Sequence, residues 1–461
     1  MPYVLGIHVG ATATSAAIAR RDGGRWGAAS PVPLSSTGPT VPTVLCRVQD
    51  GSFVAGEQAS RQERTHHEWV VRGFTRHVGD DAPMLVGSEF VPAQALVAAV
   101  VEWVADTVAQ QLGHPAEHIT LAHSATWGPF RAHLVRQALA GLGIRDATLV
   151  PEPVAVALDH ASKRPVAEQD AVAVANIGGT GFDATVLRRR EPGFEIVGST
   201  LDSGHPSGQD LDDEVFAHLR AEFAEDLGQL DPADPAQRAA LAGLRADCSR
   251  AKESLSHHPG ATVRVDVPGL RTDYALSRSR YEQLVSPHLE RVPELLVQAV
   301  QSAAVDPEDL SALVLAGGAA RTPLVRQLVA ERFERTPLVD PAPELVAARG
   351  AALSAVGVLS SVHDQAASAA ETSVLMRIEG PPSGGLDVID GEPERADPPR
   401  PPVEVEPMYL EPPDEDRERW FKILKLSAAA LLIIGGLVLT VVQGFDGGGG
   451  HPLSPVTSQQ R

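Results

Sequence analysis

The chain has 461 residues, of which 43% are hydrophobic, so it is long enough for several domains and can bury a substantial core. Lys and Arg total 39 against 59 Asp and Glu, giving a net charge of −20, which argues against a nucleic-acid partner because phosphate backbones need a basic surface. Two cysteines, Cys46 and Cys248, exclude a disulfide framework and suit a reducing cytoplasm. Residues 1–10 lack the basic leader and long apolar core of a signal peptide.

The most informative feature is an internal repeat, in which residues 4–21 match residues 172–189. In each copy an apolar strand runs into a Gly/Thr turn, and a second short strand of small or β-branched residues follows. We predict two β-hairpins whose tips expose backbone N–H groups and a hydroxyl, with glycines that let an anion approach closely. A single turn of this kind would be weak evidence, because lone glycine patterns are common.

A third glycine site follows the buried strand predicted over residues 312–316. Gly317 and Gly318 end this strand, and a helix is predicted to begin near Pro323, since proline is favoured in the first turn of a helix. The glycines would let a flat ring or a phosphate lie against the backbone at the helix N-terminus. Three such sites together favour loops that bind an anion over ordinary glycine turns.

Two hairpin loops and a Gly-Gly turn resemble the actin, sugar kinase and heat-shock chaperone superfamily. Over about residues 1–360 the chain is similar to the nucleotide-binding domain of the heat-shock protein 70 (DnaK) family. The similar stretches are residues 151–158, 177–183, 207–212, 250–256 and 347–352. The resemblance implies an α/β, actin-like ATPase (ribonuclease H-like) fold, duplicated into two lobes, with ATP or ADP bound in the cleft between them.

The resemblance also implies roles for individual residues. Catalytic roles are implied for Glu152, Thr180 and Asp183, and for Arg72 at the position of the family's catalytic lysine. Contacts to the nucleotide are implied for Gly10, Ala11, Thr12, Gly178, Gly179, Thr180, Gly181, Lys252, Ser256, Gly317, Gly318 and Arg321.

The chain departs from the family where Mg²⁺ is organised. His8 and Asn176 stand where the family has aspartates. Mg²⁺ prefers anionic oxygen ligands, so Mg²⁺ binding is doubtful, and Asp183 is left to engage a cation. The alternative interpretations are a satisfied core histidine for His8 and a helix-capping carboxylate for Glu152. Arg72 can bind phosphate through two hydrogen bonds, but an arginine is not equivalent to a lysine at this position.

Composition changes after the globular domain predicted over residues 1–362. We predict an extended linker over residues 363–419, because residues 364–416 are rich in proline and carry fourteen acidic residues against three arginines. Residues 373–379 alternate like a short strand, which could pair with the domain or with a partner. Nothing in residues 364–461 resembles the family's peptide-binding β-sandwich.

A single transmembrane helix is predicted over residues 423–443, since residues 426–442 carry no charge and span about 26 Å as a helix. A buried helix of a soluble domain is the alternative, but little chain follows to bury it. Arg417, Arg419, Lys422 and Lys425 flank the N-terminal side of the span. The positive-inside rule therefore places the large domain in the cytoplasm and a short tail, residues 444–461, outside the cell membrane.

Three functions are compatible with these features. The first is a membrane-anchored ATP- or ADP-binding scaffold or sensor of the chaperone type, with weak or no hydrolysis. The second is an active chaperone-type ATPase with an altered metal site, and the third is an actin-like filament protein tethered to the membrane, which the net charge of −20 opposes. The expected partners are the nucleotide, the lipid bilayer and an unidentified cytoplasmic or membrane protein.

Overall fold

The computed structural model describes residues 1–361, except 37, 64–65, 203–204 and 232. These residues all belong to one compact unit, Met1–Gly380. The predicted linker, the transmembrane helix, the tail and the short strand over residues 373–379 lie outside the described residues.

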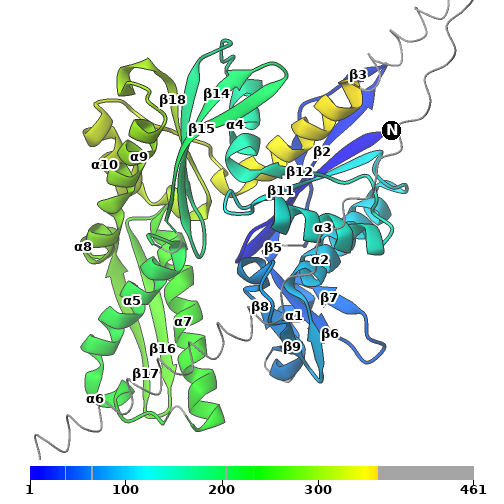
Figure 1. The fold of residues 1–461 in the computed structure, drawn as a ribbon. Coiled ribbons are helices and arrows are strands. Elements are labelled where there is room, and N and C mark those ends of the chain that lie inside the picture. Colours follow the sequence, from blue (N-terminus) through cyan, green and yellow to red (C-terminus); the bar gives the residue numbers. More distant parts are fainter. Residues whose placement is uncertain (37, 64–65, 203–204, 232, 362–461) are drawn as a thin grey trace, which may run out of the picture. The chain divides into compact units, whose positions relative to one another are not determined.

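The described part is built on two large sheets, each the centre of one lobe (Figure 1). The sheet of the first lobe has the order β12-β11-β1-β2-β3, with β4 and β5 also pairing with β2. Its strands are β1 Tyr3–Val9, β2 Ala13–Asp22, β3 Arg25–Trp26, β4 Ser30–Pro31, β5 Thr40–Pro42, β11 His118–His123 and β12 Thr148–Pro151. The sheet of the second lobe has the order β15-β14-β13-β18-β19, with strands β13 Ala171–Ile177, β14 Phe182–Arg190, β15 Gly193–Asp202, β18 Leu310–Ala316 and β19 Leu338–Val339.

The two sheets repeat one pattern, which confirms the predicted duplication. β1 pairs antiparallel with β2 and parallel with β11. β13 likewise pairs antiparallel with β14 and parallel with β18. Both predicted hairpins and the strand before Gly317 are therefore present, and each repeat sits at the centre of its sheet.

Helices cover both faces of each sheet, which explains why the central strands are apolar throughout. In the first lobe these helices are α2 Ala93–Leu112 and α3 Pro129–Gly141. In the second lobe they are α9 Arg291–Ser302 and α10 Pro323–Phe333, the last beginning at the predicted proline. Along β13, Ala173 and Ala175 face α9 and α10, while Val172 and Val174 face the other side.

That other side is covered by two helices lying between the sheets, α4 Glu152–Lys163 and the helix over residues 346–361 (Figure 1). The helices cross closely, because a Cβ atom on Gly350 would lie 1.8 Å from the Ala155 carbonyl oxygen. Gly6 has the same role in β1, where a Cβ atom would lie 2.1 Å from the backbone nitrogen of Ala352. Glycine at these positions lets the layer pack against both lobes.

Smaller elements extend each lobe. The first lobe carries a three-stranded sheet, a hairpin and short helices: β6 Val44–Arg47, β7 Phe53–Ala55, α1 Gly56–Gln62, η1 His67–Trp69, β8 Val70–Arg72, η2 Phe74–His77, β9 Met84–Val86 and β10 Glu89–Val91. The second carries α5 Gly208–Glu222, α6 Ala224–Leu227, α7 Pro235–Leu255, β16 Gly260–Val267, β17 Leu270–Ser277, α8 Arg278–Leu289, η3 Pro307–Asp309 and η4 Gly318–Arg321. A further short helix, η5 Pro343–Leu345, precedes the helix over residues 346–361.

Two helices among the described residues are long and apolar enough to cross a membrane by length and composition, Ala93–Leu112 and Pro343–Ser361. Both pack in the structure as core helices do. The first contributes Leu96 and Val101 to the core of the first lobe, and the second packs Ala348 and Ala352 against its sheet.

Candidate functional site

The two predicted phosphate loops, residues 10–12 and 178–181, meet in space. A Cβ atom on Gly179 would lie 2.1 Å from Thr12 Oγ1, so only glycine fits at this position beside the first loop. The second loop is also held by the start of α5, where the backbone N–H groups of Gly208 and Gln209 donate to the carbonyls of Gly178 and Gly179. The repeat therefore builds one surface from two distant parts of the chain.

Behind the loops, four polar side chains form a connected group. His8 and Asn176 are the next-to-last residues of β1 and β13, Asp183 lies in β14, and Glu152 is the first residue of α4. Asn176 Nδ2 donates to Glu152 Oε2 at 2.7 Å and to Asp183 Oδ2 at 3.0 Å. His8 Nε2 lies 3.1 Å from Glu152 Oε1. The second oxygen of Asp183, Oδ1, is buried and has no hydrogen-bond partner among the described residues.

The surroundings push the pKa values of the two carboxylates in opposite directions. Burial alone would raise the pKa of Glu152, but the His8 charge, the hydrogen bonds from His8 and Asn176, and the His123 charge together bring it below its ordinary value. Burial, together with the charge of Glu152, raises the pKa of Asp183 to about 7. The site therefore pairs an ionised carboxylate with one that holds a proton near neutral pH.

The structure shows which contacts His8 and Glu152 make. His8 is partly buried and directly contacts Glu152, so it belongs to the polar group rather than to the apolar core. Both oxygens of Glu152 are engaged by His8 and Asn176, and no side chain caps the start of α4. The roles of both residues in nucleotide chemistry stay predictions.

Sequence reasoning missed His123, which ends β11 beside β1 and β12. Its ring is buried and stacks on Trp127 with the ring centroids 5.4 Å apart. Burial lowers the pKa of His123, although the charge of Glu152 acts in the opposite direction. The carboxyl ends of parallel strands meet at one edge of a sheet, so the strand 118–123 was the signal that could have revealed this residue.

The predicted nucleotide-contacting residues of the second lobe are grouped around the same place. Lys252, on α7, donates to the Gly208 carbonyl at 3.0 Å and pairs with Asp212 at 2.9 Å. Gly317 has φ of 84°, and a Cβ atom there would lie 2.3 Å from the Ile177 carbonyl oxygen, so a glycine is required. The space beside Gly318 is open, with nothing within 4 Å of a Cβ atom placed there.

Two further predicted residues have contacts of their own. Ser256 is the C-cap of α7. Arg321, in η4, is bound through two hydrogen bonds of 2.7 and 3.0 Å to Glu344 and lies 3.4 Å from His257. An Arg321 contact to adenosine would therefore be made by a side chain that Glu344 already orients.

Arg72 makes no contact with the polar group formed by His8, Glu152, Asn176 and Asp183 in the part of the chain that the structure describes. It ends β8, and its guanidinium donates to both carboxylate oxygens of Glu63 and to Ser60, all within the first lobe and exposed. None of the contacts of Arg72 in the described ranges reaches Glu152 or Asp183. Its catalytic role stays a prediction.

The donor set does not fit a Mg²⁺ ion held by the protein. The amide nitrogen of Asn176 lies between the two carboxylates and donates to both, whereas Mg²⁺ requires oxygen ligands. No cluster of three or more His, Cys, Asp or Glu side chains suited to a metal was found in the described part of the chain. Two surface cavities found in the described residues are lined by residues outside this polar group.

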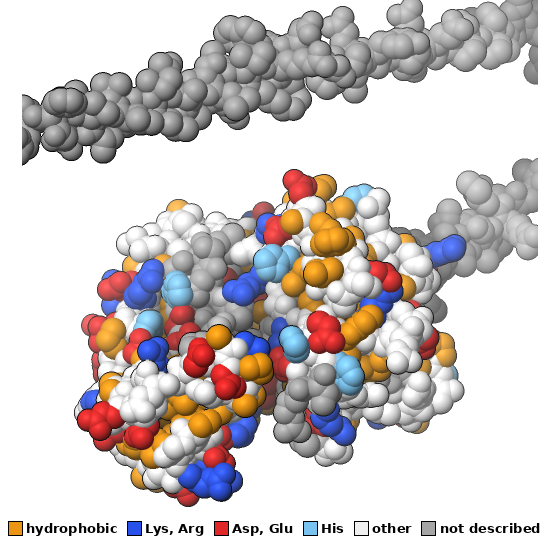
Figure 2. Space-filling model, turned by 90° about the horizontal axis from the view of Figure 1, so that it is seen from below, with side chains coloured by type: hydrophobic (Ala, Val, Ile, Leu, Met, Phe, Trp, Pro, Cys, Tyr) orange, Lys and Arg blue, Asp and Glu red, His pale blue; other side chains and the backbone are white. Residues whose placement is uncertain are grey.

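From below, the two lobes are separated by a hollow bordered by basic, acidic and histidine side chains (Figure 2).

The model of the family described as "Hsp70 protein" matches residues 61–368 of this chain. The chain belongs to the Hsp70 family.

Curated relatives agree with this membership. The Hsp70-family chain is 25% identical over 360 residues to proteins named "Chaperone protein DnaK" from Thermosipho melanesiensis (strain DSM 12029 / CIP 104789 / BI429) and Thermosipho africanus (strain TCF52B). The matched region covers 77% of this chain but only 59% and 58% of those relatives. The chain thus spans little more than half the length of the relatives it matches.

Proposed function

We propose that this chain is a membrane-anchored, nucleotide-binding member of the Hsp70 family, which binds ATP or ADP and acts as a scaffold or sensor with little or no hydrolysis. Family membership and the two meeting glycine loops support nucleotide binding. The acidic segment and the apolar run near the C-terminus support the anchor.

Weak hydrolysis is supported above all by the position of Asn176. Phosphoryl transfer is accelerated by positioning and by neutralising charge at the phosphates. Here the neutral amide of Asn176 donates hydrogen bonds to both carboxylates, and His8 contacts the other oxygen of Glu152. Glu152 would have to give up one of these partners before it could orient an attacking water.

One observation favours the second candidate, an active ATPase with an altered metal site. The buried Oδ1 atom of Asp183 has no partner among the described residues, and buried polar atoms are normally paired. A water or cation held there would satisfy it. The two candidates differ in the rate of hydrolysis and are separated by a single-turnover assay.

We therefore expect the full chain in detergent to hydrolyse ATP at least tenfold more slowly than its double variant His8→Asp/Asn176→Asp, equivalent to about 1.4 kcal/mol in barrier height. The variant restores two carboxylates at the ends of β1 and β13, and the gain should require Mg²⁺. Measurement of single-turnover hydrolysis with and without Mg²⁺ checks this.

The matched control is His67→Asp, which introduces an aspartate at an exposed histidine and should leave the rate unchanged. Fast Mg²⁺-dependent hydrolysis by the wild-type chain would contradict the scaffold or sensor function and support the ATPase.

Nucleotide binding is tested separately. Gly318→Val places a side chain in the open space beside η4 and should abolish ADP binding measured by calorimetry, without loss of thermal stability. Gly193→Val is the control, since the space there is also open but lies at the start of β15, where valine suits the strand. Absence of binding by the wild-type chain at millimolar ATP or ADP would refute the proposal.

The anchoring also remains part of the proposal. In it, residues 1–362 form the cytoplasmic domain, residues 363–419 are a linker, residues 423–443 cross the cell membrane once and residues 444–461 lie outside. The partner would be a cytoplasmic or membrane protein, within reach of a flexible linker.

A further inference from the structure

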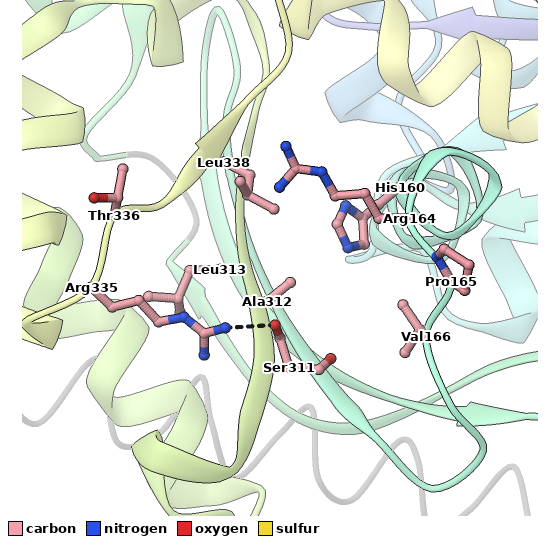
Figure 3. Close-up of a pocket in the computed structure, with 10 residues that line it drawn as sticks. All are labelled: His160, Arg164, Pro165, Val166, Ser311, Ala312, Leu313, Arg335, Thr336 and Leu338. Carbon is pink, nitrogen blue, oxygen red and sulfur yellow. Dashed lines mark hydrogen bonds between the residues drawn. The ribbon is translucent and has the colours of Figure 1, made fainter.

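A cavity of about 170 Å³ lies on the second lobe, between the C-terminal end of α4 and the start of β18. Figure 3 shows its lining, in which Arg164 extends from the end of α4 across the cavity toward Leu338, with His160 beside it. Arg335 approaches from the segment that follows α10. The volume corresponds to about five or six water molecules, enough for a small anionic group and a short stem.

The cavity carries positive charge that nearby acids do not neutralise. None of its ten lining residues is acidic. Two carboxylates lie close by, but they serve other cations: Asp159 pairs with Lys163 and Arg349 at 2.7 and 2.8 Å, and Asp340 pairs with the same two residues at 2.7 and 2.8 Å.

The guanidinium of Arg164 makes no hydrogen bond or ion pair to any residue that the structure describes. Arg335 is oriented by the strand, because it donates to the backbone carbonyls of Leu310 and Ser311. β19 pairs with β18 only at Val314 and Leu315, so the start of β18 has no strand beside it at this edge. One arginine is therefore held in place and the other is free to bind.

The two arginines and the absence of acidic lining residues favour an anionic ligand. Guanidinium groups recognise carboxylate and phosphate through paired, parallel hydrogen bonds. Pro165, Val166 and Leu338 provide an apolar wall for a short carbon stem. We propose that this cavity binds an oxyanion, a phosphate monoester or a carboxylate, through the guanidinium of Arg164, with the positive charge of Arg335 in the same cavity adding to the attraction.

This binding site is separate from the nucleotide site. Glu152 is at the first residue of α4 and Arg164 immediately follows its last. Twelve helical residues at 1.5 Å each place the two ends about 18 Å apart. The proposal therefore does not depend on nucleotide binding, and each site is measured with the other altered or filled.

The test uses the full chain in detergent, saturated with ADP and held at constant ionic strength with chloride. Inorganic phosphate, phosphoserine and glutamate are each titrated by calorimetry. We expect at least one to bind, with an affinity reduced at least tenfold by Arg164→Gln. ADP binding should be equal in both proteins.

The control is Arg264→Gln, which removes an exposed arginine from β16 and should leave anion binding unchanged. Preference for phosphate and phosphoserine would identify a phosphate ligand, and preference for glutamate would identify a carboxylate ligand. Equal anion binding by wild type and Arg164→Gln would overturn the proposal, as would a signal seen only without ADP, since the anion would then occupy the nucleotide loops. No binding of any of the three probes would overturn it as well.

Discussion

At the scale of single residues, the centre of the site is one amide between two carboxylates. Asn176 is the chain's only asparagine. Its Nδ2 donates to Glu152 and Asp183, and its Oδ1 faces the backbone at Gly317. A carboxylate in its place would be a third acidic group in a buried cluster, so the asparagine suits a site that is stable without a metal.

The first prediction concerns the raised pKa of Asp183, which is about 7 in the folded chain against an ordinary value of 3.8. Between these values the folded chain retains a proton that the unfolded chain has released, so this group's contribution to stability falls as pH rises from about 4 to 7. Asp183→Asn cannot ionise and lacks this loss. The free energy of unfolding of the variant relative to wild type, measured with urea, should rise by roughly 2 kcal/mol between pH 5 and pH 8.

Asp273→Asn is the control, because this carboxylate is exposed on β17. Its difference from wild type should not change with pH. As a second readout, a chain labelled with ¹⁵N only at asparagine gives one side-chain amide signal, which should titrate with a midpoint near pH 7. A signal that does not move between pH 5 and 8 would contradict the assignment to Asp183.

At the scale of elements, α4 joins the site to the packing between the sheets. Its first residue is Glu152, and near its end Asp159 is buried and paired with Arg349 of the helix over residues 346–361. Lys163 and Asp340 complete this network. The position of Glu152 therefore depends on how α4 is held between the lobes.

Removing Arg349 should be costly, because Asp159 would lose its main partner in a buried position. We expect Arg349→Met to lower the free energy of unfolding by about 3 kcal/mol, measured by chemical denaturation. The second substitution in Arg349→Met/Asp159→Leu removes the stranded charge and should recover part of that loss. Arg21→Met breaks an exposed pair with Glu117 and should cost less than about 1 kcal/mol. Equal costs for the two single variants would show that the buried network adds nothing.

At the scale of the whole molecule, the proposed topology places the domain in the cytoplasm and the tail outside. The native cysteines suit a labelling test, because Cys46 and Cys248 are 3% and 0% exposed. A cysteine introduced as Ser454→Cys should react with a membrane-impermeant thiol reagent in intact cells. The control Ser361→Cys, exposed at the end of the described chain, should react only after lysis. The reverse pattern would reverse the topology.

The repeat and its consequences could be predicted from the sequence. Continuous apolar segments, glycine turns and Pro323 depend on local backbone preferences, so the hairpins, the strand before Gly317 and the start of α10 were all predicted correctly. The family followed from short motifs in a fixed order. The resemblance to the family also drew attention to His8 and Asn176, which stand where the family has aspartates.

Tertiary structure alone decided which side chains meet. His123 joins the site because β11 lies beside β1, and Asn176 reaches Glu152 because α4 packs between the two sheets. Arg72 is bound to Glu63, a partner nine residues earlier in the chain that no motif marks. The raised pKa of Asp183 depends on burial, and the oxyanion cavity depends on the end of α4 lying beside β18. Distances between segments far apart in the chain are set by tertiary packing. Local sequence patterns therefore do not predict them.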